Sequence, residues 1–92
     1  MQERLEATIH GRVQMVMYRD FAQRKAAGLK LRGEVQNLSD GTVRVVAEGP
    51  RIKLEQYLVK LHKGSLLARV ESVEHVWLPA TGEFTRFDIV YA

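Results

Sequence analysis

The sequence of 92 residues contains no cysteine. Disulfide bonds, thiol nucleophiles and cysteine-based zinc sites are therefore excluded. The first residues, from Met1 to Glu6, lack the apolar run that is typical of a signal peptide. No stretch of the sequence approaches the roughly 20 apolar residues of a membrane span. We therefore expect a soluble cytoplasmic protein that does not bind a membrane.

Charge of one sign is also scarce, because the net charge is only +3 and the isoelectric point is near 9.5. Such mild basicity suits a small anion and is too weak to require a nucleic-acid partner. Apolar residues make up 46% and charged residues 27%, a composition typical of a globular protein. This length suffices for one hydrophobic core. We expect residues 1–92 to form a single domain and to act as a monomer.

A strand and a helix are predicted to meet near the N-terminus. Apolar and polar residues alternate over about Arg4–His10, which indicates a half-buried strand, and apolar residues recur at helical spacing over about Asp20–Leu29. The corner between them, Gly11–Phe21, would direct unpaired N–H groups and the positive end of a helix dipole at one point. Such a corner can bind an anion, and Arg19 could close over it. By itself, this pattern favours an ordinary loop with a solvated arginine over an anion site.

The remaining residues complete an alternating order of strands and helices. The Asp40-Gly41 pair is typical of a hairpin turn. Gly33 indicates a bulge or a close backbone approach, and Pro50 suits the first position of a helix. The order predicts an α+β, ferredoxin-like βαββαβ sandwich, with two helices on one face of an antiparallel sheet and a short extra C-terminal strand. Beyond the first strand and helix, strands are predicted over about Leu31–Leu38, Thr42–Glu48, Ala68–Leu78 and Phe84–Tyr91, and a helix over Arg51–His62.

Two spaced motifs resemble the signatures of the acylphosphatase family. Gly11-x-Val13-Gln14-x-Val16-x-Tyr18-Arg19 is similar to the first signature, which is usually written G-x-V-Q-G-V-x-F-R. Gly33-x-Val35-Gln36-Asn37-x-x-x-Gly41-x-Val43, closed by Gly49, resembles the second signature. The tail Phe87-x-Ile89-x-Tyr91 resembles the ending of the family. The resemblance covers nearly the whole chain, in the right order.

This resemblance implies a hydrolase, an acylphosphatase (EC 3.6.1.7), which splits acyl phosphates into a carboxylate and inorganic phosphate. It implies that Arg19 binds the phosphoryl group and that Asn37 positions the attacking water. A small acyl phosphate is the expected partner, and a phosphate or sulfate ion is expected to occupy the same site. No cofactor or metal is expected, since the three histidines lie on different predicted elements without ligand spacing. The phosphate-binding loop implied by the resemblance supplies the backbone amides of Gln14, Met15, Val16, Met17, Tyr18 and Arg19.

The chemistry explains why these residue types are suitable. An acyl phosphate is a reactive mixed anhydride, so positioning and electrostatic stabilisation can carry its hydrolysis without a covalent nucleophile or a metal. The guanidinium of Arg19 gives bidentate contact and stays protonated at neutral pH. The amide of Asn37 can orient a water but is too weak to act as a general base. We therefore expect a flat pH profile of activity near neutrality.

Two departures from the family signatures leave another function open. Met15 stands where the first signature has glycine, and Glu34 stands where the second has an aromatic residue. A residue other than glycine at positive φ is unfavourable, and an inward Glu34 would repel phosphate. The alternative is a non-catalytic anion-binding module that has lost turnover through Met15 and Glu34. An RNA-binding ferredoxin-like domain is less favoured, because the predicted strand Thr42–Glu48 has no aromatic residue to stack on bases.

Overall fold

The computed structural model describes residues 1–91 and contains all the strands and helices expected from the sequence. The fold class is therefore confirmed, and the element boundaries differ from the expected ones by a few residues. The largest difference is at the last strand, which begins at Phe87 instead of Phe84. In chain order the elements are β1 (Gln2–Arg12), α1 (Tyr18–Gly28), β2 (Arg32–Asn37), β3 (Val43–Pro50), α2 (Arg51–Lys63), β4 (Arg69–Pro79) and β5 (Phe87–Val90).

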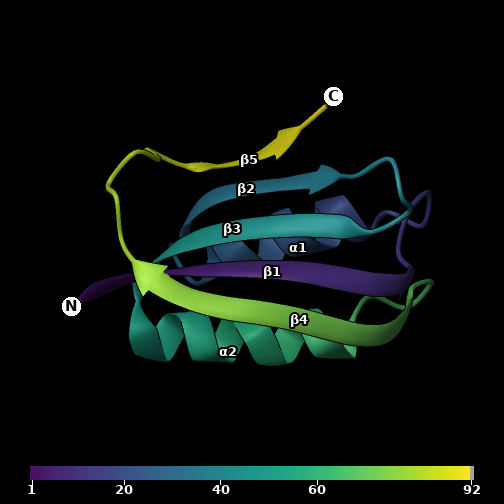
Figure 1. The fold of residues 1–92 in the computed structure, drawn as a ribbon, viewed down its shortest axis with the longest axis horizontal. Helices are drawn as coiled ribbons and strands as arrows, with labels where there is room; N and C mark the ends of the chain where they lie inside the picture. The colour runs from purple at the N-terminus through teal and green to yellow at the C-terminus, as the bar shows by residue number, and fades with distance from the viewer. Residues whose placement is uncertain (92) are drawn as a thin grey trace.

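The five strands form one sheet in the order β4-β1-β3-β2-β5 (Figure 1). β1 pairs antiparallel with β3 and β4, and β2 pairs antiparallel with β3. β5, the extra C-terminal strand, pairs parallel with β2, so the sheet is mixed, a direction that the sequence did not predict. The reason is the connection after β4, which crosses to the opposite edge of the sheet and enters alongside β2. Alternation in the sequence shows which face of a strand is buried and does not show which neighbour the strand pairs with.

Both helices lie on the same side of the sheet, as Figure 1 shows. α1 packs against β2 and β5, and α2 packs against β1, β3 and β4. The hydroxyl of Tyr57 on α2 donates a hydrogen bond to the carbonyl of Ala22 on α1 at 2.8 Å, which joins the two helices. The core lies between the helices and the inward-facing residues of the strands, among them Leu5, Ala7 and Ile9 of β1 and Val43, Val45 and Ala47 of β3.

Two glycines belong to close backbone contacts within the sheet. Gly33 on β2 has a φ of 154°, and a Cβ atom there would overlap the carbonyl oxygen of Val46 on β3. The predicted close approach at Gly33 is thus confirmed. Gly11 has a φ of 128° and follows a register shift between β1 and β4. This bulge bends the end of β1 at the point where the chain leaves for α1.

The start of each helix differs slightly from the prediction. α1 begins at Tyr18, so Arg19 belongs to its first turn together with Asp20. Pro50 caps α2 and does not occupy its first position, because its ψ of 139° is extended and Pro50 still belongs to β3. Within residues 1–91, no helix is long and apolar enough to cross a membrane.

Candidate active site

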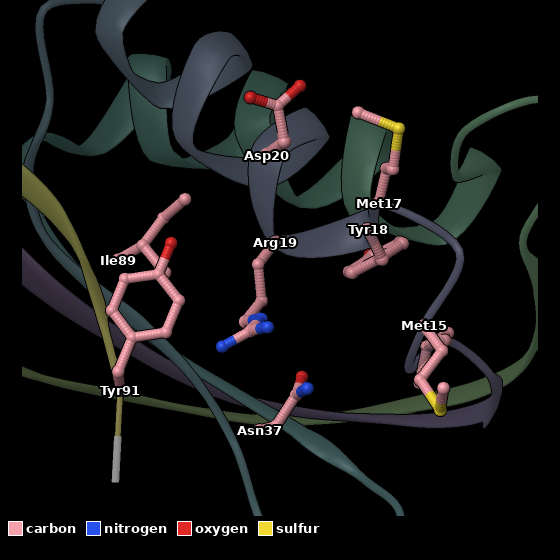
Figure 2. Close-up of a pocket in the computed structure, with 9 residues that line it drawn as sticks. Met15, Met17, Tyr18, Arg19, Asp20, Asn37, Ile89 and Tyr91 are labelled. Carbon is pink, nitrogen blue, oxygen red and sulfur yellow. The ribbon is translucent and has the colours of Figure 1, made fainter.

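A pocket of about 430 Å³ lies where β1 and β2 end and α1 begins (Figure 2). Arg19 and Asn37 both line it, although they belong to α1 and β2. The structure therefore brings together the two residues that the sequence singled out for catalysis. The other residues that line the pocket are Val13, Met15, Met17, Tyr18, Asp20, Ile89 and Tyr91.

The position of Asn37 next to the end of β1 follows from the strand order. β3 lies between β1 and β2, and its residue Val43 pairs with Ile9 on one side and with Asn37 on the other. Asn37 also shares a face of β2 with the buried Val35, so its side chain is on the side of the sheet that carries the helices. As a result, Asn37 lies across β3 from the corner at which β1 leads into α1.

The loop before α1 holds two methionines in the left-handed region of the backbone. Met15 has a φ of 59° and Met17 a φ of 61°. Their side chains are 99% and 69% exposed, and Figure 2 shows both directed away from Arg19. Left-handed residues alternating with others turn successive N–H groups toward one side, which creates a concave site for an anion. Because the methionine side chains point outward, neither blocks the backbone amides of this loop.

The N–H groups at the start of α1 also remain available for an anion. Met17 is the N-cap of the helix, and no side chain among residues 1–91 caps its first turn. The first N–H groups of a helix have no partner within the helix, and they carry the positive end of its dipole. In this helix they lie at the pocket that Arg19 lines. This start of α1 can therefore donate to an anionic ligand.

The side chain of Gln14 connects the loop to the turn between β2 and β3. Its Nε2 donates hydrogen bonds to the carbonyl oxygens of Leu38, at 2.8 Å, and Thr42, at 2.9 Å. Within the turn, a carboxylate oxygen of Asp40 accepts bonds from the N–H of Thr42 at 3.0 Å and from its hydroxyl at 2.6 Å. The loop before α1 is thus fixed next to the residue that follows Asn37.

The guanidinium of Arg19 lies beside the ring of Tyr91. Among residues 1–91, its guanidinium takes part in no hydrogen bond or ion pair, and its Cζ lies 4.9 Å from the centroid of the Tyr91 ring. The neighbouring carboxylate of Asp20 pairs with Arg24 at 2.9 Å. Figure 2 shows Arg19 pointing from α1 into the space between Tyr91 and Asn37. The positive charge of Arg19 is therefore directed into the pocket, and no carboxylate side chain among residues 1–91 pairs with it.

Asn37 carries a buried acceptor without a donor. Its Oδ1 is shielded from solvent, and no donor within residues 1–91 reaches it. A buried polar atom without a partner is destabilising by about 1–3 kcal/mol, so its presence in a folded protein requires an explanation. Here the atom belongs to a residue that lines the pocket, which makes a bound water or ligand the natural donor.

Tyr18 lines the pocket but is unsuited to proton transfer. Its hydroxyl is buried and donates a hydrogen bond to the carbonyl of Leu61 near the end of α2, at 2.7 Å. Burial raises the pKa of Tyr18 well above its ordinary value, so the hydroxyl stays protonated. In the described part of the chain, no three His, Asp or Glu side chains gather closely enough to hold a metal ion.

The structure distributes the predicted loop residues between the pocket and its support. Met15, Met17, Tyr18 and Arg19 line the pocket, whereas the side chain of Gln14 bonds to the neighbouring turn and Val16 packs against the core. Glu34 is on the face of β2 opposite to Asn37, because side chains alternate along a strand.

The sequence did not identify Ile89 and Tyr91 as pocket residues. Their spacing of two along the chain puts them on one face of a strand with Phe87, but this spacing does not show what the face contacts. The missing information was the pairing of β5 with β2, which brings this face next to α1.

Comparison with known proteins shows the family of the chain. The sequence profile described as "Acylphosphatase" matches residues 5–89. The acylphosphatase of Thermus thermophilus is 57% identical over 74 residues, which cover 80% of this chain and 84% of that protein. The acylphosphatase of Salinibacter ruber is 43% identical, with 96% and 93% covered. The crystal structure of acylphosphatase from Bacillus subtilis superposes with a TM-score of 0.93 at 34% identity, covering 97% of this chain and 99% of that one.

Proposed function

The chain belongs to the acylphosphatase family, and from this premise we propose how its pocket hydrolyses acyl phosphates. The activity is that of EC 3.6.1.7, in which the carboxyl–phosphate bond of an acyl phosphate is hydrolysed. The proposal concerns the residues that perform this reaction. It rests on one observation: Arg19 and the start of α1 offer donors that no side chain among residues 1–91 occupies, and these donors face the same pocket as the acceptor of Asn37 that lacks a donor within those residues.

The phosphoryl group is bound by Arg19 and by the backbone amides of the loop from Met15 to Arg19. The guanidinium offers parallel N–H donors that match two phosphoryl oxygens, and its charge does not depend on pH near neutrality. The amides at the start of α1 add fixed dipoles that cost no reorganisation as charge spreads over the phosphoryl oxygens. The absence of a side-chain cap among the described residues supports this role, because a capping oxygen would occupy the same amides.

The attacking water is held by Asn37. The unpaired Oδ1 accepts one O–H of the water, which leaves a lone pair of the water oxygen to approach phosphorus. The new P–O bond forms while the bond between phosphorus and the carboxyl oxygen breaks, and the carboxylate leaves with the bonding electrons. One proton of the water stays on the attacking oxygen, and the other passes to a phosphoryl oxygen or to solvent. Since an amide is no general base, the rate depends on position and charge rather than on the protonation of Asn37.

The two departures from the family signatures do not obstruct this arrangement. The side chain of Met15 is 99% exposed, so it leaves the amides of the loop accessible. Glu34 is on the opposite face of β2 from Asn37, where its charge is directed away from the phosphate site. Both observations support turnover over the alternative of a non-catalytic anion-binding module. The single domain, the monomeric state and the cytoplasmic location expected from the sequence stay predictions.

The test is steady-state hydrolysis of benzoyl phosphate by the wild type and by Arg19→Ala, in the presence of a chelator. Removing one preorganised donor from such a site costs about 10²–10³ in rate, and the affinity for inorganic phosphate should fall as well. Lys25→Ala is a matched control, because Lys25 is a cation on the same helix and does not line the pocket. The assignment of Arg19 is wrong if Arg19→Ala retains the kcat/KM of the wild type, or if Lys25→Ala loses as much.

A further inference from the structure

We propose that Tyr91 is a positioning residue for this reaction, and that its ring holds the guanidinium of Arg19 in the orientation that receives the phosphoryl group. This inference rests on the proposed role of Arg19 in binding phosphate. Tyr91 directly follows β5 and belongs to neither signature motif. Three features of the structure support it: the placement of α1, the placement of β5, and the kind of contact that joins them.

The placement of α1 directs Arg19 toward the C-terminal end of the chain. Arg19 and Gln23 are four residues apart and share one face of the helix. The Nε2 of Gln23 donates a hydrogen bond to the carbonyl oxygen of Phe87 at 3.1 Å. This bond fixes that face of α1 over β5. Arg19 lies one turn earlier on the same face, so it also lies on the side of α1 that faces β5.

The placement of β5 directs Tyr91 toward Arg19. Inward-facing side chains alternate with outward-facing ones along β5 and its next residue, and the inward set is Phe87, Ile89 and Tyr91. Ile89 packs against the core and pairs with Val35 of β2. The ring of Tyr91 is therefore on the helical side of the sheet, where Figure 2 shows it beside Arg19. The Cζ of Arg19 lies 4.9 Å from the ring centroid, within the range of a cation–π contact.

The kind of contact matters because it leaves the donors of Arg19 available. A guanidinium stacks through its flat face, whereas it binds phosphate through the N–H groups at its edge. A carboxylate in place of Tyr91 would occupy those N–H groups and neutralise the charge. The ring instead restricts the long side chain of Arg19 before substrate arrives, which reduces the entropy that binding must otherwise remove. Tyr91 thus fits the requirements for orienting Arg19 without competing with the substrate.

The ring of Tyr91 is 74% exposed, so its removal creates no cavity in the core. We therefore expect Tyr91→Leu to keep the thermal midpoint of the wild type. Its KM for benzoyl phosphate and its inhibition constant for inorganic phosphate should both rise, by roughly two- to fivefold, the strength of an exposed cation–π contact. The change in kcat should be smaller, because Arg19 remains present and charged. Tyr91→Phe keeps the ring and should restore wild-type values.

Leu66→Ala is the matched control, because Leu66 is 98% exposed and does not line the pocket. It should leave both constants unchanged. A Tyr91→Leu variant with wild-type KM and wild-type phosphate inhibition would overturn the proposal, as would a Tyr91→Phe variant that is as impaired as Tyr91→Leu.

A double-mutant cycle separates this inference from the proposed function. In an Arg19→Ala background, kcat/KM should be the same with and without Tyr91→Leu, since there is no guanidinium left to orient. A loss caused by Tyr91→Leu that persists in this background contradicts a role through Arg19. If Arg19→Ala itself has no effect, the proposed role of Arg19 in binding phosphate is wrong. If Arg19→Ala is impaired and Tyr91→Leu matches the wild type, only the role of Tyr91 is wrong.

Discussion

Two buried polar groups at opposite ends of the sheet differ in their hydrogen-bond partners. The Oδ1 of Asn37 has no donor within residues 1–91, and it lies where β2 ends at the pocket. The carboxylate of Glu48 is only 1% exposed and lies near the start of β1, where Arg4 is its partner across the strands. Several donors surround the carboxylate of Glu48, whereas no donor among residues 1–91 reaches the Oδ1 of Asn37.

The donors around Glu48 come from a strand and from the connection after β4. The N–H groups of Thr81 and Gly82 donate to it at 3.1 Å and 3.0 Å, and the hydroxyl of Thr81 at 2.8 Å. The guanidinium of Arg4 pairs with it at 3.2 Å and also with Glu6 and Glu83. Glu48 thereby fixes the chain that leads from β4 to β5 onto the sheet.

The pKa of Glu48 reflects this balance. Burial by itself would raise it, but the hydrogen bonds from Gly82, Thr81 and Arg4 outweigh burial and hold the pKa below its ordinary value. A buried polar group that has all its hydrogen-bond partners, such as Glu48, stabilises the fold. A buried polar group that lacks a partner and lines a pocket, such as Asn37, indicates ligand or water binding. Three predictions test this difference and a fourth tests backbone strain in the loop before α1, from the largest expected effect to the smallest.

The largest effect is expected for Asn37→Ala. Its kcat for benzoyl phosphate should fall by about 10²-fold, because the attacking water is no longer oriented. The free energy of unfolding should stay the same or increase, since the variant removes a buried acceptor that has no partner. Gln36→Ala, on the other face of β2, is the control and should retain activity. A variant Asn37→Ala that unfolds more easily and turns over normally would assign Asn37 a structural role.

Glu48→Gln is expected to have the opposite result. The free energy of unfolding should decrease by about 1–3 kcal/mol, because charge-assisted hydrogen bonds are lost from a buried site. Its kcat should match the wild type, since the pocket is at the other end of the sheet. Urea unfolding and the benzoyl phosphate assay measure the two quantities on the same sample. A large loss of kcat with an unchanged free energy of unfolding would show that Glu48 contributes to catalysis and not to stability.

The stability of the wild type should depend on pH through Glu48. Its folded-state pKa is lowered, so its contribution is complete above the ordinary pKa of a glutamate, about 4.3, and is lost as the pH falls below that value. The difference in unfolding free energy between the wild type and Glu48→Gln should therefore shrink between about pH 5 and pH 3. Urea titrations at several pH values measure it. A constant difference across this range would show that the charge of Glu48 contributes nothing.

The smallest effect is expected for Met15→Gly. A residue other than glycine in the left-handed region destabilises the folded state by roughly 1–2 kcal/mol. Glycine removes this strain, but part of the gain in stability is lost because glycine has greater freedom in the unfolded chain. At a φ of 59°, Met15→Gly should increase the free energy of unfolding by up to about 1 kcal/mol. Activity should be retained because the backbone amides stay in place. Met15→Leu keeps the strain and serves as the control, and equal stability of the two variants would argue against backbone strain at this position.

Much of the site could be predicted from local patterns and family motifs. Arg19 lies in the first turn of a helix that follows a strand, and such corners present N–H groups to an anion. Asn37 was found through the second signature motif. The roles of Ile89 and Tyr91 were not predicted, because their place in the pocket depends on β5 crossing to the edge next to β2. The burial of Glu48 was likewise not predictable from an alternating strand, since the chain that covers it is distant in sequence.

The sequence by itself determined which residues form strands and helices, which face of each is buried, and to which family the chain is similar. These properties depend on neighbouring residues, on side-chain periods of two and 3.6, and on spaced motifs. Only the tertiary structure decided that the last strand runs parallel to β2, that Tyr91 contacts Arg19, and that Asn37 keeps an unpaired oxygen in a pocket. These properties join residues far apart in the chain, and pairing between distant segments is decided by packing over the whole sheet rather than by local preference.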